Sequence, residues 1–140
     1  MDSYKYKVFI LIFSILLTSC NQKKSPIIKI DNNLSIPIRC LSIDKIDIDK
    51  KFLAKLNKLY NFNNNCKYKL YIKYKTDIVC NSPYNPNQKN LSSFPTSFLN
   101  LEIRDGLKLK YSYYIDLNDN VNEDDIKDAF IKVKKDLGLK

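Results

Sequence analysis

The sequence predicts a two-layer α+β domain in which two helices pack on one face of a four-stranded mixed sheet, in the order β-α-β-β-β-α. Three observations indicate this fold class. Residues Cys66–Lys75 alternate between apolar and charged side chains, Arg104-Asp105-Gly106 separates two further apolar segments, and the residues after Asn122 repeat with the period of a helix. We expect a single domain of this kind over residues 27–140.

The first strand is expected at Leu34–Ile43. Ile36, Ile38 and Cys40 share one face of this segment, and Pro37 indicates that a strand begins here or lies at an edge. A right-handed crossover through the helix that follows would lay the next strand parallel to this one.

The helix that follows has an apolar face and a basic face. Either Asp47 or Asp49 can cap its N-terminus. Apolar side chains recur at helical spacing over about three turns, at Ile48, Phe52, Leu56 and Leu59. The other side carries Lys51, Lys55 and Lys58, so we expect that side in solvent.

The strand Cys66–Lys75 has the clearest alternation in the chain, which indicates one face in the core and one in water. Its odd-numbered positions carry the residues that we call the basic row: Lys67, Lys69, Tyr71, Lys73 and Lys75. Such a row can contact several phosphates or carboxylates at once, and we take it as the candidate site for an anionic ligand. The alternative is a solvated face that only keeps the protein soluble.

The next two strands are expected to form a hairpin around Arg104-Asp105-Gly106. A two-residue Asp-Gly turn would place apolar residues opposite lysines, so the faces would not match. A three-residue loop with Gly106 in the left-handed conformation and a bulge restores the match. The expected pairs are then Ile103 with Leu107, Leu101 with Leu109, Leu99 with Tyr111 and Glu102 with Lys108.

The last helix has consistent signals at both ends. Asn122 is its expected N-cap, and Gly138 is expected to end it. Its apolar stripe consists of Ile126, Ala129, Phe130, Val133 and Leu137. Six acidic residues lie in Asp116–Asp128, and we attribute most of them to capping and to the helix dipole.

The composition excludes several kinds of catalytic and metal site. The chain contains no histidine, which removes histidine triads and histidine–metal sites, and its two glycines cannot form a glycine-rich phosphate loop. Its only glutamates are Glu102, in the expected hairpin, and Glu123, in a helix cap, so neither resembles half of a glycosidase pair. We therefore expect a protein that is not an enzyme and that has no cofactor and no metal. The alternative that the composition leaves open is an enzyme with an aspartate pair or a lysine nucleophile.

Residues 1–19 are expected to form a removable signal peptide. Lys5 and Lys7 precede the apolar run Val8–Leu17. As a helix this run rises about 15 Å, well short of the roughly 30 Å hydrocarbon core of a bilayer, so it suits a signal peptide better than a membrane span. Residues 20–26 are polar, and we expect them to form a short tether.

The motif Leu17-Thr18-Ser19-Cys20 resembles the lipobox of bacterial lipoproteins. The resemblance implies cleavage after Ser19, a diacylglycerol thioether on Cys20 and acylation of its new amine, for example by palmitate. Several acyl chains anchor a protein stably. The alternative is an ordinary secretory signal with an unrelated cysteine. Asn21 replaces the aspartate that retains many lipoproteins on the inner membrane, so we expect the outer membrane, facing the periplasm.

The charge of the chain favours anionic partners. Cleavage would remove Lys5, Lys7 and Asp2, so the formal net charge would fall from +9 to +8. Such a balance suits lipid headgroups, lipopolysaccharide phosphates or an acidic protein. We expect no nucleic acid, because an exported chain rarely meets it.

With Cys20 lipidated, three cysteines remain, so at most one intramolecular disulfide can form. Along a continuous strand, Cys66 and Cys80 would lie about 46 Å apart. A disulfide needs α-carbons within about 7 Å. The parallel crossover would bring the ends of both strands to the same edge of the sheet. We therefore expect a Cys40–Cys80 disulfide, with Cys66 as a buried thiol.

A lipidated chain with this order of elements and a basic sheet resembles the lipoprotein of the outer-membrane lipopolysaccharide-assembly complex. In that family the domain plugs a β-barrel translocon and contacts lipopolysaccharide through basic residues. The resemblance implies a non-enzymatic accessory or assembly subunit of the cell envelope. The alternatives are a binding inhibitor or immunity-type lipoprotein that neutralises an acidic protein, and an adhesin or structural surface lipoprotein.

Overall fold

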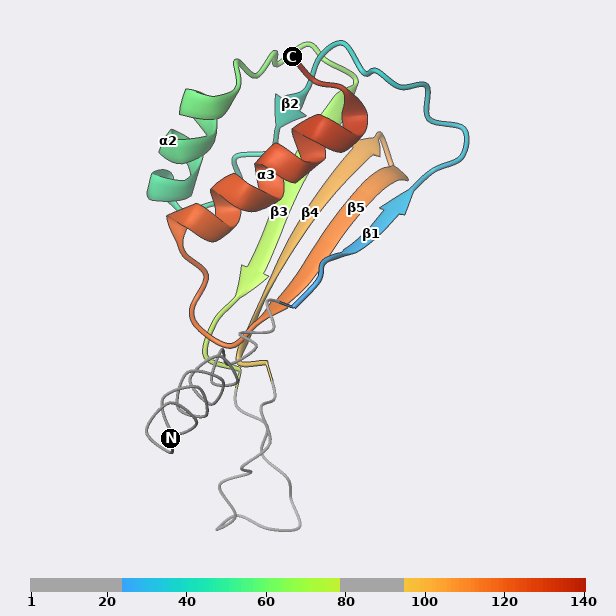
Figure 1. The fold of residues 1–140 in the computed structure, drawn as a ribbon. Coiled ribbons are helices and arrows are strands. Elements are labelled where there is room, and N and C mark those ends of the chain that lie inside the picture. The colour runs from blue at the N-terminus through green and yellow to red at the C-terminus, as the bar shows by residue number, and fades with distance from the viewer. Residues whose placement is uncertain (1–23, 79–94) are drawn as a thin grey trace, which may run out of the picture.

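The computed structural model describes residues 24–78 and 95–140, which fold as an α+β domain (Figure 1). Its strands form one mixed sheet in the order β1-β5-β4-β3-β2. The elements in chain order are β1 (Ile27–Ile30), β2 (Ser42–Ile43), α2 (Lys50–Leu59), β3 (Tyr68–Lys75), β4 (Ser97–Asp105), β5 (Lys108–Leu117) and α3 (Glu123–Leu137). The predicted α+β class with two helices on a mixed sheet is confirmed, although the sheet has five strands and not four.

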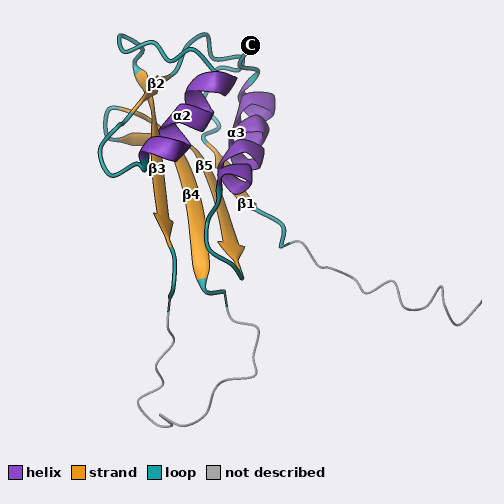
Figure 2. Cartoon of the chain, turned by 90° about the vertical axis from the view of Figure 1, so that its left-hand side faces the viewer, coloured by secondary structure: helices purple, strands orange, loops and turns teal. Residues whose placement is uncertain are grey.

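Both helices cover the same face of the sheet, as Figures 1 and 2 show from two directions. The core lies between these two layers. Its fully buried side chains come from both, and they include Phe52, Leu56, Leu70, Leu99, Leu101, Ile103, Tyr111, Ile126, Phe130 and Val133. No described element covers the other face of the sheet, which we call the open face.

The first strand is shorter than expected. Only the last two residues of Leu34–Ile43 join the sheet, as β2, and they pair in parallel with β3, as the crossover predicts. The residues before them pack against the C-terminal end of α3, where the Ile38 amide donates to the Leu137 carbonyl at 3.1 Å. Pro37 has no amide hydrogen to contribute to a strand ladder, so the segment is poorly suited to a longer strand.

The strand β1 was not expected. It pairs antiparallel with β5 at the edge of the sheet, with Ile28 opposite Tyr113. Its partner lies more than eighty residues later in the chain, and four residues are too few to establish an alternating pattern. The predicted four-stranded sheet therefore lacks one strand, the edge strand β1.

Both helices begin at N-cap residues that the sequence indicates. Asp49 caps α2, because its carboxylate accepts the Lys51 amide at 2.9 Å, and this decides between the two aspartates considered. Asn122 caps α3 and forms a capping box with Asp125. Gly138 ends α3 in the left-handed conformation, at φ +62°. The prediction of α3 is confirmed at both ends.

The hairpin register differs from the expected one. Asp105 pairs with Lys108 across a two-residue turn, and a bulge between Ile103 and Arg104 shifts the register further along β4 and β5. Gly106 is left-handed as expected, at φ +58°. The observed pairs are Ile103 with Tyr111, Leu101 with Tyr113, Leu99 with Ile115 and Glu102 with Ser112.

The physical reason for this register is burial beneath α3. It places Tyr111 and Tyr113 in the core, where their exposed fractions are 0% and 6%. The expected register would have placed Leu107 and Leu109 opposite Ile103 and Leu101, where Tyr111 and Tyr113 lie, and these leucines remain 94% and 40% exposed. Two buried tyrosines remove more apolar surface from water than two leucines at the tip of a hairpin could.

The predicted Cys40–Cys80 disulfide is wrong, because the structure joins Cys40 to Cys66, with their α-carbons 5.8 Å apart. The error follows from the position of β2. The prediction puts Cys40 near the end of the first strand, but β2 begins two residues after Cys40, so Cys40 lies at the entry to the parallel pair β2–β3. Cys66 lies just before β3, at the same end of the pair. Cys80 is outside the described residues.

Candidate functional site

The basic row lies on the open face of the sheet. Lys69, Lys73 and Lys75 belong to β3, and Lys67 precedes that strand by one residue. All four lysines are exposed, and Tyr71 between them is half-buried. The alternate residues of β3 face the helices, so the division of this strand into a core face and a solvent face is confirmed.

Two lysines of the basic row pair with acids of the neighbouring strand β4. Lys67 Nζ lies 3.6 Å from Asp105 Oδ2, and Lys73 Nζ lies 3.6 Å from Glu102 Oε2. The phenol of Tyr68 and the Asp105 carboxylate raise the pKa of Lys67. These two ammonium groups are therefore already partly neutralised by the protein itself.

The other two lysines, Lys69 and Lys75, have no ion pair within the described residues. In the sheet register Lys69 lies opposite Arg104, and Lys75 lies opposite Phe98. Six residues of extended strand separate the two lysines, which is about 20 Å. A ligand that contacts both must therefore carry anionic groups that are about as widely spaced.

Glu102 is the centre of a polar network in the middle of the open face. Its carboxylate accepts hydrogen bonds from Asn100 Nδ2 at 3.0 Å and from Arg104 Nε at 2.9 Å, and Lys73 lies close to it. Burial alone would raise the pKa of Glu102, but the hydrogen bonds from Arg104 and Asn100, with the charges of Arg104 and Lys73, outweigh it and lower that pKa. The network holds Arg104 against the sheet, so its guanidinium is less free than the ammonium of Lys69.

Aromatic rings lie beside the unpaired Lys75. Phe98 of β4 and Tyr114 of β5 stack with their ring centroids 5.7 Å apart and their planes at 22°. The Tyr114 hydroxyl donates to Asp116 Oδ1 at 2.8 Å, which fixes the ring in place. An apolar surface next to an unpaired ammonium group is one that an amphipathic anion can contact with both of its parts.

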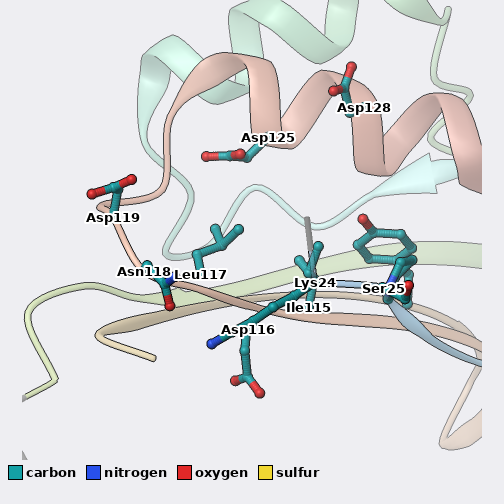
Figure 3. Close-up of a pocket in the computed structure, with 11 residues that line it drawn as sticks. Lys24, Ser25, Ile115, Asp116, Leu117, Asn118, Asp119, Asp125 and Asp128 are labelled. Carbon is teal, nitrogen blue, oxygen red and sulfur yellow. The ribbon is translucent and has the colours of Figure 1, made fainter. Parts of the chain in front are cut away.

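The structure also contains an acidic cleft of about 470 Å³, which sequence reasoning missed (Figure 3). It is formed by the segment before β1, the end of β5 and the first turns of α3. Asp119, Asp125 and Asp128 line it, and so does Asp116, although the Asp116 carboxylate accepts from Tyr114 on the open face. Capping explains only Asp125 among them, since its carboxylate accepts the Asn122 amide at 2.9 Å. The signal was present in the sequence, as the run of acids in Asp116–Asp128, but capping and the helix dipole were taken to explain most of that run.

No helix within the described ranges is long and apolar enough to cross a membrane. Those same residues contain no group of three or more histidine, cysteine, aspartate or glutamate side chains that could hold a metal ion. The lipobox-like motif and Cys20 lie outside the residues that the structure describes. Comparison with known protein families, with curated proteins and with solved structures gives no match for this chain. The functional proposal therefore rests on the residues of the chain itself.

Proposed function

We propose that this chain is a bacterial lipoprotein anchored through Cys20 to the outer membrane, where it faces the periplasm. We infer that it is a non-enzymatic accessory or assembly subunit of the cell envelope, and that its open face contacts an anionic ligand such as lipopolysaccharide. The observation that carries the proposal is the motif Leu17-Thr18-Ser19-Cys20 at the end of the apolar run Val8–Leu17. A small-residue cleavage site and a cysteine coincide there, as lipidation requires.

The short segment between Cys20 and Lys24 limits how far the proposed anchor can lie from the domain. Lys24 is four residues from Cys20, so their α-carbons can be at most about 14 Å apart. Lys24 lies just before β1, at the end of the sheet where β5 ends and β4 begins. A lipid on Cys20 would keep this end of the domain near the bilayer, with the β4–β5 turn at the far end (Figure 1).

The open face supports contact with an anionic ligand. Lys69 and Lys75 are exposed and unpaired within the described residues, and the stacked rings of Phe98 and Tyr114 lie beside Lys75. The ligand that matches this surface has separated negative charges and an apolar part. Lipopolysaccharide has both, because phosphates flank its acyl-bearing sugar core, and this agrees with the resemblance to the lipopolysaccharide-assembly lipoprotein.

The anchor is tested by growing cells with an alkyne analogue of palmitate and isolating the protein. We expect the wild-type chain to be labelled and to sediment with outer-membrane fragments. The Cys20→Ala chain should remain an unlabelled precursor of higher mass. A labelled Cys20→Ala chain, or a wild-type chain without label, would contradict anchoring at this residue.

The accessory role is tested by extraction in a mild detergent and identification of the proteins that co-purify. A β-barrel partner supports the proposal. A soluble acidic protein in its place would support the binding-inhibitor hypothesis instead. Lys69→Glu combined with Lys75→Glu should reduce recovery of the partner, and the same change at Lys45 and Lys50, which lie outside the open face, should not.

A further inference from the structure

The outer side of the helix layer carries a group of lysines that the proposed function does not use. The helices α2 and α3 lie side by side, and no described element covers their outer side (Figure 2). A cleft of about 410 Å³ between them is lined by four lysines, Lys51, Lys55, Lys58 and Lys127. Lys134 lies beside it, because its ammonium donates to the carbonyl of Leu59, which also lines the cleft, at 3.3 Å. We call these five lysines, together with Ile131, the basic helix surface.

Carboxylates offset only one end of the basic helix surface. Acids at the N-terminal ends of the two helices pair with Lys51 and Lys55, at distances of 3.7–4.0 Å. The other three lysines, Lys58, Lys127 and Lys134, have no acidic partner within the described residues. Their positive charge is therefore not neutralised by the domain itself, and it complements an anionic partner.

An exposed apolar side chain lies among these unpaired lysines. Ile131 follows Lys127 by four residues and precedes Lys134 by three, so the three share one side of α3. Ile131 is 45% exposed, while Lys127 and Lys134 are half-buried and can keep their ammonium groups in solvent. Ammonium groups around an apolar side chain suit the surface of an anionic bilayer, because phosphates meet the charges and the apolar group enters between the headgroups.

The spacing of the lysines favours a bilayer over a small anion. Lys51 and Lys58 are about 10 Å apart along the axis of α2, and Lys127 and Lys134 are equally far apart along α3. One phosphate cannot contact all of these ammonium groups, and it has no apolar part for Ile131 to contact. A bilayer presents many phosphates in one plane with acyl chains beneath them.

We propose that the basic helix surface docks on the headgroups of an anionic phospholipid bilayer. Lys58, Lys127 and Lys134 pair with lipid phosphates, and Ile131 enters between the headgroups. The open face lies on the other side of the sheet, so this orientation leaves it free for its proposed ligand. The docking goes beyond the proposed function and does not require lipidation. A lipid on Cys20 would only keep the domain close to the membrane.

The test uses the full-length chain with the substitution Ile131→Trp, because the wild-type sequence contains no tryptophan. The chain is mixed at low salt with vesicles of phosphatidylcholine, with and without phosphatidylglycerol. We expect the tryptophan emission to shift to shorter wavelength only with the vesicles that contain phosphatidylglycerol, because the indole then leaves water. The shift should be lost at about 1 M salt, where the screening length is about 3 Å.

Charge reversal shows whether these particular lysines are responsible. Lys58→Glu with Lys127→Glu, introduced into the Ile131→Trp chain, should abolish the shift. The control reverses Lys45 and Lys108, two exposed lysines that do not line the cleft, and it should keep the shift. Equal loss in the control would overturn the proposal, because net charge alone would then explain the effect. No shift with the anionic vesicles, or an equal shift with the neutral ones, would overturn it too.

A second reporter tests the orientation of the domain. Leu107 is 94% exposed at the β4–β5 turn, so Leu107→Trp places the same probe away from the helices. We expect no shift there that depends on phosphatidylglycerol, and such a shift in place of the one at residue 131 would overturn the proposal. The comparison is between two lipid compositions with the same chain. Its result therefore holds whether or not Cys20 carries a lipid, and palmitate labelling tests that anchor separately.

Discussion

The two faces of the sheet share the same strands but are stabilised by different kinds of interaction. The covered face buries large apolar side chains against α2 and α3, and many of them have no exposed surface. The open face is held by a polar network around Glu102 and by one aromatic stack, with lysines projecting from β3 into solvent. The covered face therefore determines stability, and the open face can carry charge at little cost to the fold.

Side chains alternate between the two faces along each strand. Neighbouring residues of one strand therefore contribute either to the stability of the core or to the charge of the open face. In β3, Leu70 is fully buried while Lys69 beside it is exposed. A substitution at Lys69 can therefore alter the proposed ligand contact without touching the core. Substitutions on the two faces should therefore have very different effects on the free energy of unfolding.

The largest effect is expected for Phe130→Ala in α3, which packs on the covered face. Phe130 has no exposed surface and packs against the rings of Phe62 and Tyr60, with centroids 5.7 and 6.2 Å away. Loss of the ring should lower the free energy of unfolding by about 3–5 kcal/mol. Urea titration monitored by circular dichroism measures this. A loss below about 1 kcal/mol would mean that the covered face does not carry the stability assigned to it.

Removal of the disulfide should have the next largest effect. The bond between Cys40 and Cys66 closes a loop with a sequence separation of 26 residues that contains β2 and α2. Replacement of both cysteines by alanine should cost about 2–4 kcal/mol. Peptide mapping without reductant should also recover the two cysteines in one linked fragment. A fragment that links Cys40 to Cys80 would contradict the structure.

Glu102→Gln tests how much the polar network of the open face contributes. Because the folded pKa of Glu102 is lowered, the charged carboxylate stabilises the fold above its ordinary value of 4.5, and this contribution disappears as pH falls through the folded pKa. At pH 7 the substitution should cost about 1 kcal/mol, since charge-assisted hydrogen bonds are lost from a site that is open to solvent. Thermal melts across pH 3–7 should show the two proteins converging at the acidic end. A constant difference would rule out a contribution from ionisation.

Local patterns allowed much of this architecture to be predicted. The helix α3 was predicted at both ends because its cap, its apolar stripe and Gly138 all lie within a few residues of one another. The core and solvent faces of β3 followed from alternation alone. These features depend on residues that are close together in the sequence, so local sequence patterns are enough to predict them.

The features that were missed depend on partners distant in the sequence. β1 is stabilised by β5, and the hairpin register is set by burial of Tyr111 and Tyr113 beneath α3. The acidic cleft combines Asp119, which follows β5, with Asp125 and Asp128 of α3. No pattern among sequence neighbours reveals these contacts, and only the fold brings the residues together.

The most direct test of the account is binding and stability measured together on one pair of variants. Lys69→Glu with Lys75→Glu reverses the two lysines that have no ion pair among the described residues; Lys73 is left unchanged because it contacts Glu102. The control reverses Lys45 and Lys50, which changes the net charge equally. The ligand is purified lipopolysaccharide at low salt.

We predict that the open-face variant binds lipopolysaccharide at least about tenfold more weakly than the control does, because two ammonium contacts become repulsive. Its free energy of unfolding should stay within about 0.5 kcal/mol of the wild type. Binding that is unchanged in the open-face variant, or weakened equally in the control, would contradict the claim that this face contacts the anionic ligand.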